Sequence, residues 1–315
     1  MRRDGGFVLI NALILVAALA AVSVYLLTRA ETGRVRLSDQ RDADQVMLIL
    51  DSFEAYAQSR VIEALSGGGT AQEGQADGAL SVPVARGRVS GTLRELDGLF
   101  NLNWLANPTD ELADVAFRRL LDRLALPPDT ADLLVARLAG GAAAQEAIPL
   151  SDPPVHPVGG PVPMMALLRD LPGLSPRTRD ALVPFVTVIP GDSRLNVNAA
   201  PLDVLAAFLP EATPGQIAQL VSSRAVEPFG DVNDFLLRTG LAEAPAMPLP
   251  PDSPPVPDAA GPPRLDEARI ALQSRWFEAF ATAELADLQA TRLIQLEYRG
   301  PGERPAINWR ITTRP

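Results

Sequence analysis

Two residue types that supply much of enzyme chemistry are absent from this 315-residue sequence, and a third is almost absent. It contains no cysteine and a single histidine, His156, and all 28 basic residues are arginine because there is no lysine. Without cysteine there can be no disulfide, zinc–thiolate site, iron–sulfur cluster or thiol nucleophile. Without lysine there can be no Schiff base, Ser–Lys dyad or P-loop lysine. The sequence therefore predicts a protein that is not an enzyme.

Positive charge is also in deficit. Asp and Glu total 38 against 28 arginines, which gives a formal net charge of −10. A protein that coats nucleic acid needs a net basic face to displace counterions, so this class is disfavoured. Hydrophobic residues reach 47%, enough for a sizeable core, while 30 prolines and 23 glycines indicate long loops or linkers.

The N-terminus holds an uncharged apolar run over residues 7–27, interrupted only by Asn11 and Ser23. Its 21 residues span roughly 31 Å as a helix, enough to cross a bilayer core. Arg2 and Arg3 precede it and favour a cytoplasmic N-terminus. A cleaved signal peptide, a plain membrane anchor and a type IV prepilin-like leader compete here. The run exceeds the usual signal-peptide length of about 7–15 residues, and Gly6 before Phe7 favours the prepilin-like leader.

The same helix is expected to continue beyond the membrane surface to about residue 65. No proline interrupts residues 31–65, and the triple glycine after Ser66 is a strong stop signal. An apolar stripe at helical spacing predicts packing on the chain's own domain. Its members are Ala43, Val46, Leu50, Phe53, Ala57 and Val61.

The rest of the chain changes character twice. Residues 80–96 alternate loosely around a turn and predict a β-hairpin. From residue 99 to about 237, apolar residues recur at helical spacing between prolines and glycines, which predicts a compact all-α unit. A proline-rich stretch over 244–263 predicts an extended connection. Residues 267–313 alternate again and predict strands, the last two joined at Gly300-Pro301-Gly302.

Two kinds of motif stand out in the helical unit. Leu171-Pro172-Gly173-Leu174 resembles the turn of a helix-hairpin-helix, in which the glycine permits the tight turn. Asn196, Asn198 and Pro201 begin what looks like a second such unit, with Pro201 at a helix N-terminus. The earlier Phe100-Asn101-Leu102-Asn103 echoes Leu195-Asn196-Val197-Asn198 and hints at an internal duplication.

The polar residues near these motifs do not predict a binding site. Arg169, Arg177 and Arg179 flank the turn, but Asp170 and Asp180 offset them, which favours a structural or docking module over DNA binding. His156 lies in a proline-rich loop and is interpreted as solvated. Asp110, Glu111 and Asp114 are interpreted as complementing a helix N-terminus rather than holding a metal. No metal or cofactor is expected.

Taken together, the leader, the long helix and the inserted repeats resemble the K-type minor pseudopilins of the type II (general) secretion pathway. The resemblance covers essentially the whole chain, and its most specific parts are the two Asn-containing motifs, the Leu171–Leu174 turn and the stretch from Pro228-Phe229 to Leu236. It implies an α+β, pilin-like fold, with the long helix packed on an antiparallel sheet. It also implies a large inserted all-α domain of two SAM-like, helix-hairpin-helix-like subdomains.

The resemblance also implies a division of the chain. The expected segments are a leader (1–6), a transmembrane half-helix (7–28), an amphipathic half-helix with the hairpin (29–97), the inserted domain (98–240), a Pro-rich linker (241–265) and the strands that complete the sheet (266–315).

Processing, partners and location follow from the same resemblance. It implies prepilin-peptidase cleavage between Gly6 and Phe7, with methylation of Phe7. It implies an inner-membrane, single-pass protein with a periplasmic C-terminal domain. The protein would lie at the pseudopilus tip with the I-, J- and H-type minor pseudopilins as partners. It would also contact the inner-membrane assembly platform. Its role would be to help initiate pseudopilus assembly and protein export.

Two features depart from pilin-like or family patterns. Asn11, the fifth residue after the expected cut, stands where most pilin-like proteins have glutamate. A carboxylate in lipid is costly without a partner, and a tip subunit has no neighbour above whose amino terminus would pair with it, so a neutral residue suits that position. The acidic calcium-binding segment suspected in relatives is replaced over residues 139–163 by a stretch in which only Glu146 and Asp152 are acidic, so calcium is not expected.

Two alternative functions stay open at this point. One is a minor pilin-like protein of another type IV pilus-like machine. The other is a membrane-anchored DNA receptor that uses the hairpin repeats, although it would need a basic face.

Overall fold

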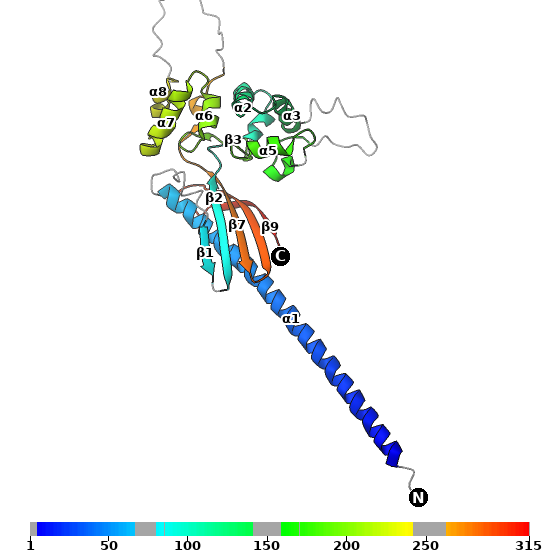
Figure 1. Ribbon diagram of the computed structural model, residues 1–315. Helices are drawn as coiled ribbons and strands as arrows, with labels where there is room; N and C mark the ends of the chain where they lie inside the picture. Colours follow the sequence, from blue (N-terminus) through cyan, green and yellow to red (C-terminus); the bar gives the residue numbers. More distant parts are fainter. Residues whose placement is uncertain are drawn as a thin grey trace, which may run out of the picture.

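A computed structural model describes residues 5–66, 80–84, 86–140, 159–169, 171–241 and 263–314. It consists of one long helix, an antiparallel sheet packed on the C-terminal half of that helix, and a helical head at the end opposite the N-terminus (Figure 1). His156 and Asp170 lie outside the described residues.

Helix α1 (Gly5–Ser66) is continuous for 62 residues, as the uninterrupted sequence predicts. From Leu9 to Gln40 its residues are exposed, whereas Val46, Leu50, Phe53, Ala57 and Val61 are buried along one face of its second half. These residues form a core with the apolar residues of the sheet, which confirms the predicted packing stripe except at Ala43, which is only half-buried and lies outside this core.

The sheet has the order β1-β2-β7-β8-β9, and all neighbouring strands are antiparallel. The first hairpin, β1 (Leu80–Val84) with β2 (Gly87–Glu95), is the predicted one. The remaining strands are β7 (Trp276–Leu285), β8 (Leu288–Glu297) and β9 (Ala306–Thr313). The head is thus inserted between the second and third strands of one sheet.

Small residues let α1 lie close to the sheet. Ala279, Ala281 and Ala283 on β7 are buried beneath it. A Cβ atom at Gly91 would come within 2.1 Å of the Phe53 ring, so this strand position accepts only glycine without rearrangement.

The head consists of two consecutive units, each of which starts and ends on a two-residue strand. The first contains β3 (Phe100–Asn101), η1 (Leu102–Ala106), α2 (Glu111–Arg123), α3 (Asp129–Leu138), η2 (Met165–Leu168), α5 (Pro176–Leu182) and β4 (Val186–Thr187). The second contains β5 (Leu195–Asn196), α6 (Leu202–Phe208), α7 (Pro214–Val226), α8 (Val232–Thr239), η3 (Glu267–Arg269) and β6 (Ile270–Ala271).

The expectation of an all-α head is wrong in one respect, because each unit is closed by a short parallel strand pair. β3 pairs with β4, and β5 pairs with β6. Helix α5 ends at Leu182, and Val186, inside the stretch expected to be all-α, belongs to β4. Two-residue strands carry no periodic signal, so the sequence pattern could not reveal them.

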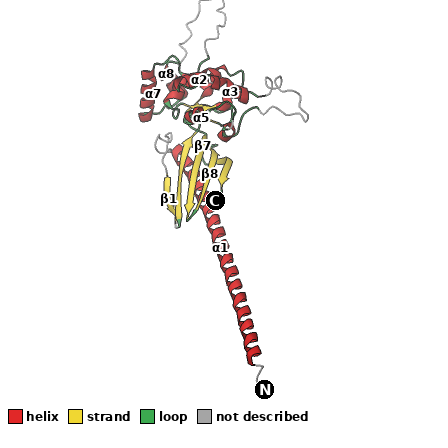
Figure 2. Cartoon of the chain, turned by 45° about the vertical axis from the view of Figure 1, so that its right-hand side comes forward, coloured by secondary structure: helices red, strands yellow, loops and turns green. Residues whose placement is uncertain are grey.

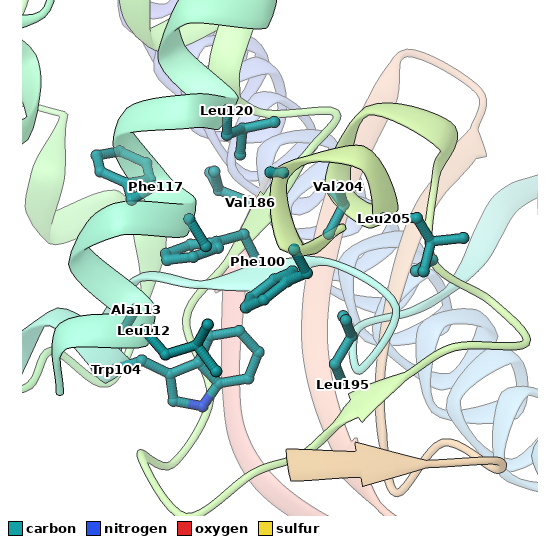
Figure 3. Close-up of a cluster of buried hydrophobic side chains, with 14 of the residues drawn as sticks. Phe100, Trp104, Leu112, Ala113, Phe117, Leu120, Val186, Leu195, Val204 and Leu205 are labelled. Carbon is teal, nitrogen blue, oxygen red and sulfur yellow. The ribbon is translucent and has the colours of Figure 1, made fainter. Parts of the chain in front are cut away.

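The segment that returns from the head to the sheet begins later than expected. Leu265 and Ile270, expected in the linker and in the sheet respectively, are buried in the core of the head. That core joins both units, and the rings of Phe100, Trp104, Phe117 and Phe208 meet in it at centroid distances of 5.1–6.0 Å. Figure 3 shows this cluster between helices of the two units. Figure 2 shows the head above the sheet, with α1 extending well beyond the sheet's lower end.

Candidate functional site

The N-terminal half of α1 is one candidate site, because it exposes a long apolar surface. Of the described helices, α1 is the one long and apolar enough to cross a membrane, with a mean hydropathy of 2.4 in its most apolar window. None of that window is buried inside the protein. The Ser23 hydroxyl is satisfied within the helix, since its Oγ donates to the Leu19 carbonyl at 2.8 Å. Such a surface requires lipid or neighbouring helices to cover it.

The residues expected to be processed lie on the first turn of α1. The helix begins at Gly5, so Gly6 and Phe7 are already helical, and the Phe7 side chain is 68% exposed. Asn11 lies one turn later and is also exposed. Cleavage, methylation and the role of Asn11 stay predictions.

The turn singled out as a hairpin, residues 171–174, connects η2 to α5 in the first unit of the head. Gly173 has φ +92°, which a glycine adopts without strain, and the Leu174 N–H donates to the Leu171 carbonyl at 3.1 Å. Ser175 Oγ then accepts the Thr178 N–H at 3.1 Å and caps α5. Arg179 forms a 2.9 Å ion pair with Asp180, so the turn lies beside a compensated charge. This geometry is that of a structural connection.

Asn101 and Asn103 clamp the first unit of the head. Asn101 Oδ1 accepts the N–H groups of Asn103 and Ile189, and its Nδ2 donates to the Ile189 carbonyl at 3.0 Å. Asn103 Nδ2 donates to the carbonyls of Val162 and Ile189, and its Oδ1 accepts the Val162 N–H at 2.8 Å. Both side chains are buried and join segments that lie 59 to 89 residues away.

Asn196 and Asn198 repeat this clamp in the second unit. Asn196 Oδ1 accepts the Asn198 N–H at 3.0 Å, as Asn101 does for Asn103. Asn198 Nδ2 donates to the carbonyls of Phe229 and Leu272, and its Oδ1 accepts the Phe229 N–H at 2.9 Å. The sequence echo between the two motifs is therefore a repeat of hydrogen-bonding geometry, and these asparagines hold the fold rather than a ligand.

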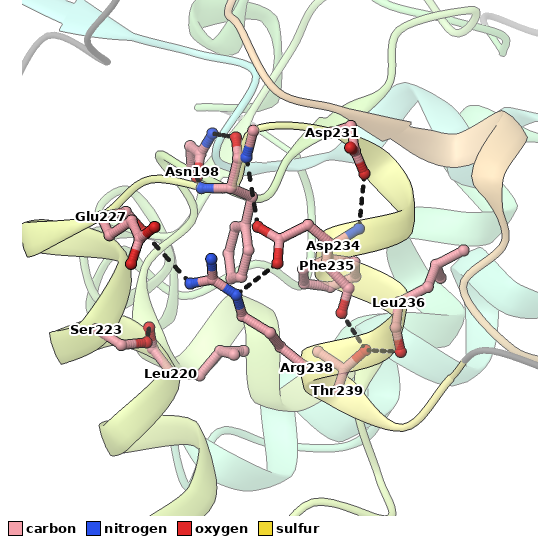
Figure 4. Close-up of polar contacts among 12 residues, drawn as sticks. Asn198, Leu220, Ser223, Glu227, Asp231, Asp234, Phe235, Leu236, Arg238 and Thr239 are labelled. Carbon is pink, nitrogen blue, oxygen red and sulfur yellow. Dashed lines mark hydrogen bonds and ion pairs between the residues drawn. The ribbon is translucent and has the colours of Figure 1, made fainter.

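The stretch from Pro228 to Leu236 surrounds that second clamp. Pro201 immediately precedes α6, and Asp231 caps α8 by accepting the Asp234 N–H at 2.7 Å. Arg238 forms a 2.6 Å ion pair with Asp234 (Figure 4). Its guanidinium also lies over the Phe229 ring. The motif residues thus support one another inside the unit.

A polar neck, which sequence reasoning missed, joins the head to the sheet. Asp97 is buried, and its Oδ2 accepts the N–H groups of Arg275 and Trp276 at 2.9 and 2.6 Å. Its carbonyl accepts the Asn196 N–H at 2.8 Å, so three distant segments meet at one aspartate. Burial raises the pKa of Asp97 to about 7, and the nearby Glu95 adds to the rise, against the opposing effect of the two N–H donors.

Ion pairs fix the register of α1 on the sheet. Arg292 on β8 is 5% exposed and lies 2.5 Å from Asp51 and 3.3 Å from Glu54. Glu54 also meets Arg310 of β9 at 3.1 Å. A buried guanidinium requires such partners, so helix and sheet can slide past each other only by breaking them.

No group of three or more His, Asp or Glu side chains gathers within metal-binding reach in the described part of the chain. The acidic trio near α2 is engaged locally, because Asp110 Oδ1 caps the helix at Ala113 and Asp114 pairs with Arg118 at 2.9 Å. Asp110 also forms an ion pair with Arg269. These contacts bear out the reading of the trio as helix N-terminal charge.

Comparisons with known proteins identify relatives of both the sequence and the fold. Residues 98–191 and 195–251 match two consecutive family models, both described as type II secretion system (T2SS), protein K. The first range corresponds to the first unit of the head. The second range covers the second unit except for η3 and β6, which lie after residue 251. The chain is 29% identical over 266 residues to a type II secretion system protein K of Pseudomonas aeruginosa, covering 75% of this chain and 77% of that protein.

A solved structure shares the fold. It belongs to the GspK-GspI-GspJ complex from the type 2 secretion system of enterotoxigenic Escherichia coli. The similarity has a TM-score of 0.61 at 21% identity and covers 89% of this chain and all of that one.

Proposed function

Because the chain belongs to the type II secretion system protein K family, and is thus a minor pseudopilin, we propose that it is the tip subunit of the pseudopilus. The observation that carries this proposal is the position of the head. It is inserted into the sheet at the end opposite the exposed half of α1 (Figure 1). In a filament held together by its N-terminal helices, a bulky unit at this end obstructs any subunit stacked above it, whereas a terminal subunit is unaffected.

The exposed half of α1 supports a single-pass anchor in the inner membrane. Its uncharged run must leave water, and arginines at positions 2 and 3 favour a cytoplasmic start, which supports a periplasmic position for the sheet and head. We infer that the prepilin peptidase cuts between Gly6 and Phe7 and that the same helix enters the filament from the assembly platform.

The partners we propose are the other minor pseudopilins. The fold relative forms a complex with GspI and GspJ, and the equivalent I- and J-type proteins are the first candidates here, with the H-type below them. The role is structural: the subunit would help to initiate the filament that exports folded proteins. The two head units are proposed to be SAM-like, since each is a small helical bundle.

Processing and assembly can be tested in one strain set. The gene is expressed in a bacterium that lacks its own K-type pseudopilin, with and without the prepilin peptidase, and the membrane protein is analysed by intact mass and N-terminal sequencing. A chain that starts at N-methyl-Phe7 only with the peptidase, co-purifies with the I- and J-type proteins and restores export supports the proposal. A cut after residue 27, or export that does not depend on the chain, overturns it.

A further inference from the structure

The two edges of the sheet differ in how open they are to another strand. The β1 edge is five residues long and includes Pro83, which has no N–H to offer. The β9 edge is eight residues long and contains no proline. In the described part of the chain, β9 pairs only with β8, so one side of its backbone carries no strand. A bulge disturbs only its start, and Trp309–Thr313 keep regular pairing with β8.

An apolar row leads across the outer face of the sheet to this edge. Phe280, Leu293 and Ile311 are direct cross-strand neighbours on β7, β8 and β9. They lie on the face opposite α1, because Ile294 and Leu296 of β8 belong to the core beneath α1. Phe280 is 41% exposed and Ile311 is 38% exposed. A further strand beside β9 would extend this row and cover its end.

A polar atom beside the row also lacks a partner. Trp309 pairs with Gln295 and so lies on the same outer face, next to Ile311. Its Nε1 is buried and, among the described residues, donates no hydrogen bond. A buried N–H left unpaired is costly, and a carbonyl group on an added strand would satisfy it once the indole turned toward the open edge.

Charge indicates what kind of strand fits. Strand β9 contains Arg310 and no acidic residue, Arg304 and Arg314 flank it, and Glu303 precedes Arg304, in a chain whose net charge is −10. Arg310 lies on the α1 side of the sheet, where it shares Glu54 with Arg292. Arg304 donates to Gln58 at 2.5 Å, beside a hollow of about 490 Å³ between α1 and the turn that precedes β9.

We propose that the β9 edge binds an extended segment of another protein as a sixth strand, with acidic and apolar residues in alternation. Because successive side chains of a strand point to opposite faces, the acidic residues would meet Arg310 and Arg304 on the α1 side. The apolar residues would cover Trp309 and Ile311 on the outer side. This site does not depend on the tip position proposed above.

The test uses the full processed chain in detergent and two labelled heptapeptides, one of alternating Glu and Val and one of alternating Lys and Val. Peptide binding is measured by fluorescence polarisation, and protection of the protein by amide hydrogen exchange. We expect the acidic peptide to bind and to slow amide exchange at Trp309–Thr313. Arg310→Glu should lower the affinity for the acidic peptide about tenfold and allow the lysine peptide to bind. Ile311→Asp should also weaken binding.

The matched control for Ile311→Asp is Val226→Asp, which introduces the same charge at an apolar residue of the head that is 88% exposed. It should leave the affinity for both peptides unchanged. Thermal denaturation of each variant separates lost binding from lost folding. Protection at β1 rather than β9, equal binding of both peptides, or no binding of either overturns the proposal. Concentration-dependent pairing of the chain with itself through β9 would also overturn it, because the occupant would then be a second copy.

Discussion

The backbone N–H of Trp276 donates a 2.6 Å hydrogen bond to Oδ2 of Asp97, and this bond ties together the two passages of the chain between sheet and head. Leu96, just before Asp97, packs with Trp276, Leu99 and Ile189 in a small apolar cluster at the same point. The orientation of the head on the sheet therefore depends in part on this buried carboxyl, together with Arg94, which donates to the Val183 and Pro184 carbonyls, and Gln295, which donates to the Val188 carbonyl.

The neck makes stability depend on pH. The pKa of Asp97 is raised from 3.8 to about 7, so between these values the folded chain holds a proton that the unfolded chain has lost. The resulting stabilisation is complete below pH 3.8 and is lost as the pH rises through 7, with an upper bound of about 4 kcal/mol. We expect a higher melting temperature at pH 5.5 than at pH 8. Asp97→Asn, whose amide oxygen still accepts both N–H groups, should flatten the difference in circular dichroism melts. A pH slope that persists in this variant would assign the effect elsewhere.

The buried guanidinium at the interface of α1 and the sheet should be sensitive to substitution. Arg292→Ala leaves the nearly buried Glu54 with the half-exposed Arg310 as its remaining partner and should lower the free energy of unfolding by about 3 kcal/mol. The matched control is Arg86→Ala, since Arg86 is 62% exposed beside Asp42 and its loss should cost less than about 1 kcal/mol. Urea unfolding of both variants measures the difference, and equal effects would show that the Arg292 cluster adds nothing beyond a surface pair.

The duplicated asparagine clamps should each stabilise their own unit. Asn103→Ala strands the Val162 N–H and carbonyl and removes one of the two donors to the Ile189 carbonyl, so it should destabilise the first unit by about 2–3 kcal/mol. Asn198→Ala should do the same in the second unit. Asn107, whose side chain meets only the nearby Thr109, is the control and should tolerate alanine. Amide hydrogen exchange shows which unit is destabilised in each variant. Equally faster exchange in both units of a single variant would contradict the idea that each clamp stabilises its own unit.

Asn11 tests the tip position. If the chain has no subunit above it, a carboxylate at this position neither pairs with a neighbouring amino terminus nor disturbs a contact with one. Asn11→Glu should therefore leave export within about twofold of the parent. Asn11→Gln, which keeps a neutral amide, is the control. Export is measured as secreted activity in the strain that lacks its own K-type pseudopilin. A specific loss of filament initiation in the glutamate variant, with normal membrane insertion, would argue against a terminal subunit.

Long periodic segments could be predicted because their pattern is local. The apolar run and the stripe from Val46 to Val61 specify α1, and the alternation from Trp276 onwards specifies the last three strands. The turn between β7 and β8 was not anticipated, since Ala286 adopts φ +51° without a glycine to signal it. The helix N-terminus at Asp110 was anticipated, because capping depends on residues three positions apart.

The sequence by itself determined the anchor, the long helix, the absence of thiol and lysine chemistry, and the order of hairpin, head and closing strands. It also revealed the repeated asparagine motif, although not what the motif does. Only the tertiary structure decided that these asparagines are buried clamps, that Asp97 joins three segments at the neck, and that β9 is left as an open edge. The physical reason is distance along the chain. The clamps and the neck depend on hydrogen bonds between residues far apart in sequence, and the open edge depends on the order of distant strands in the sheet. No local pattern encodes such partners.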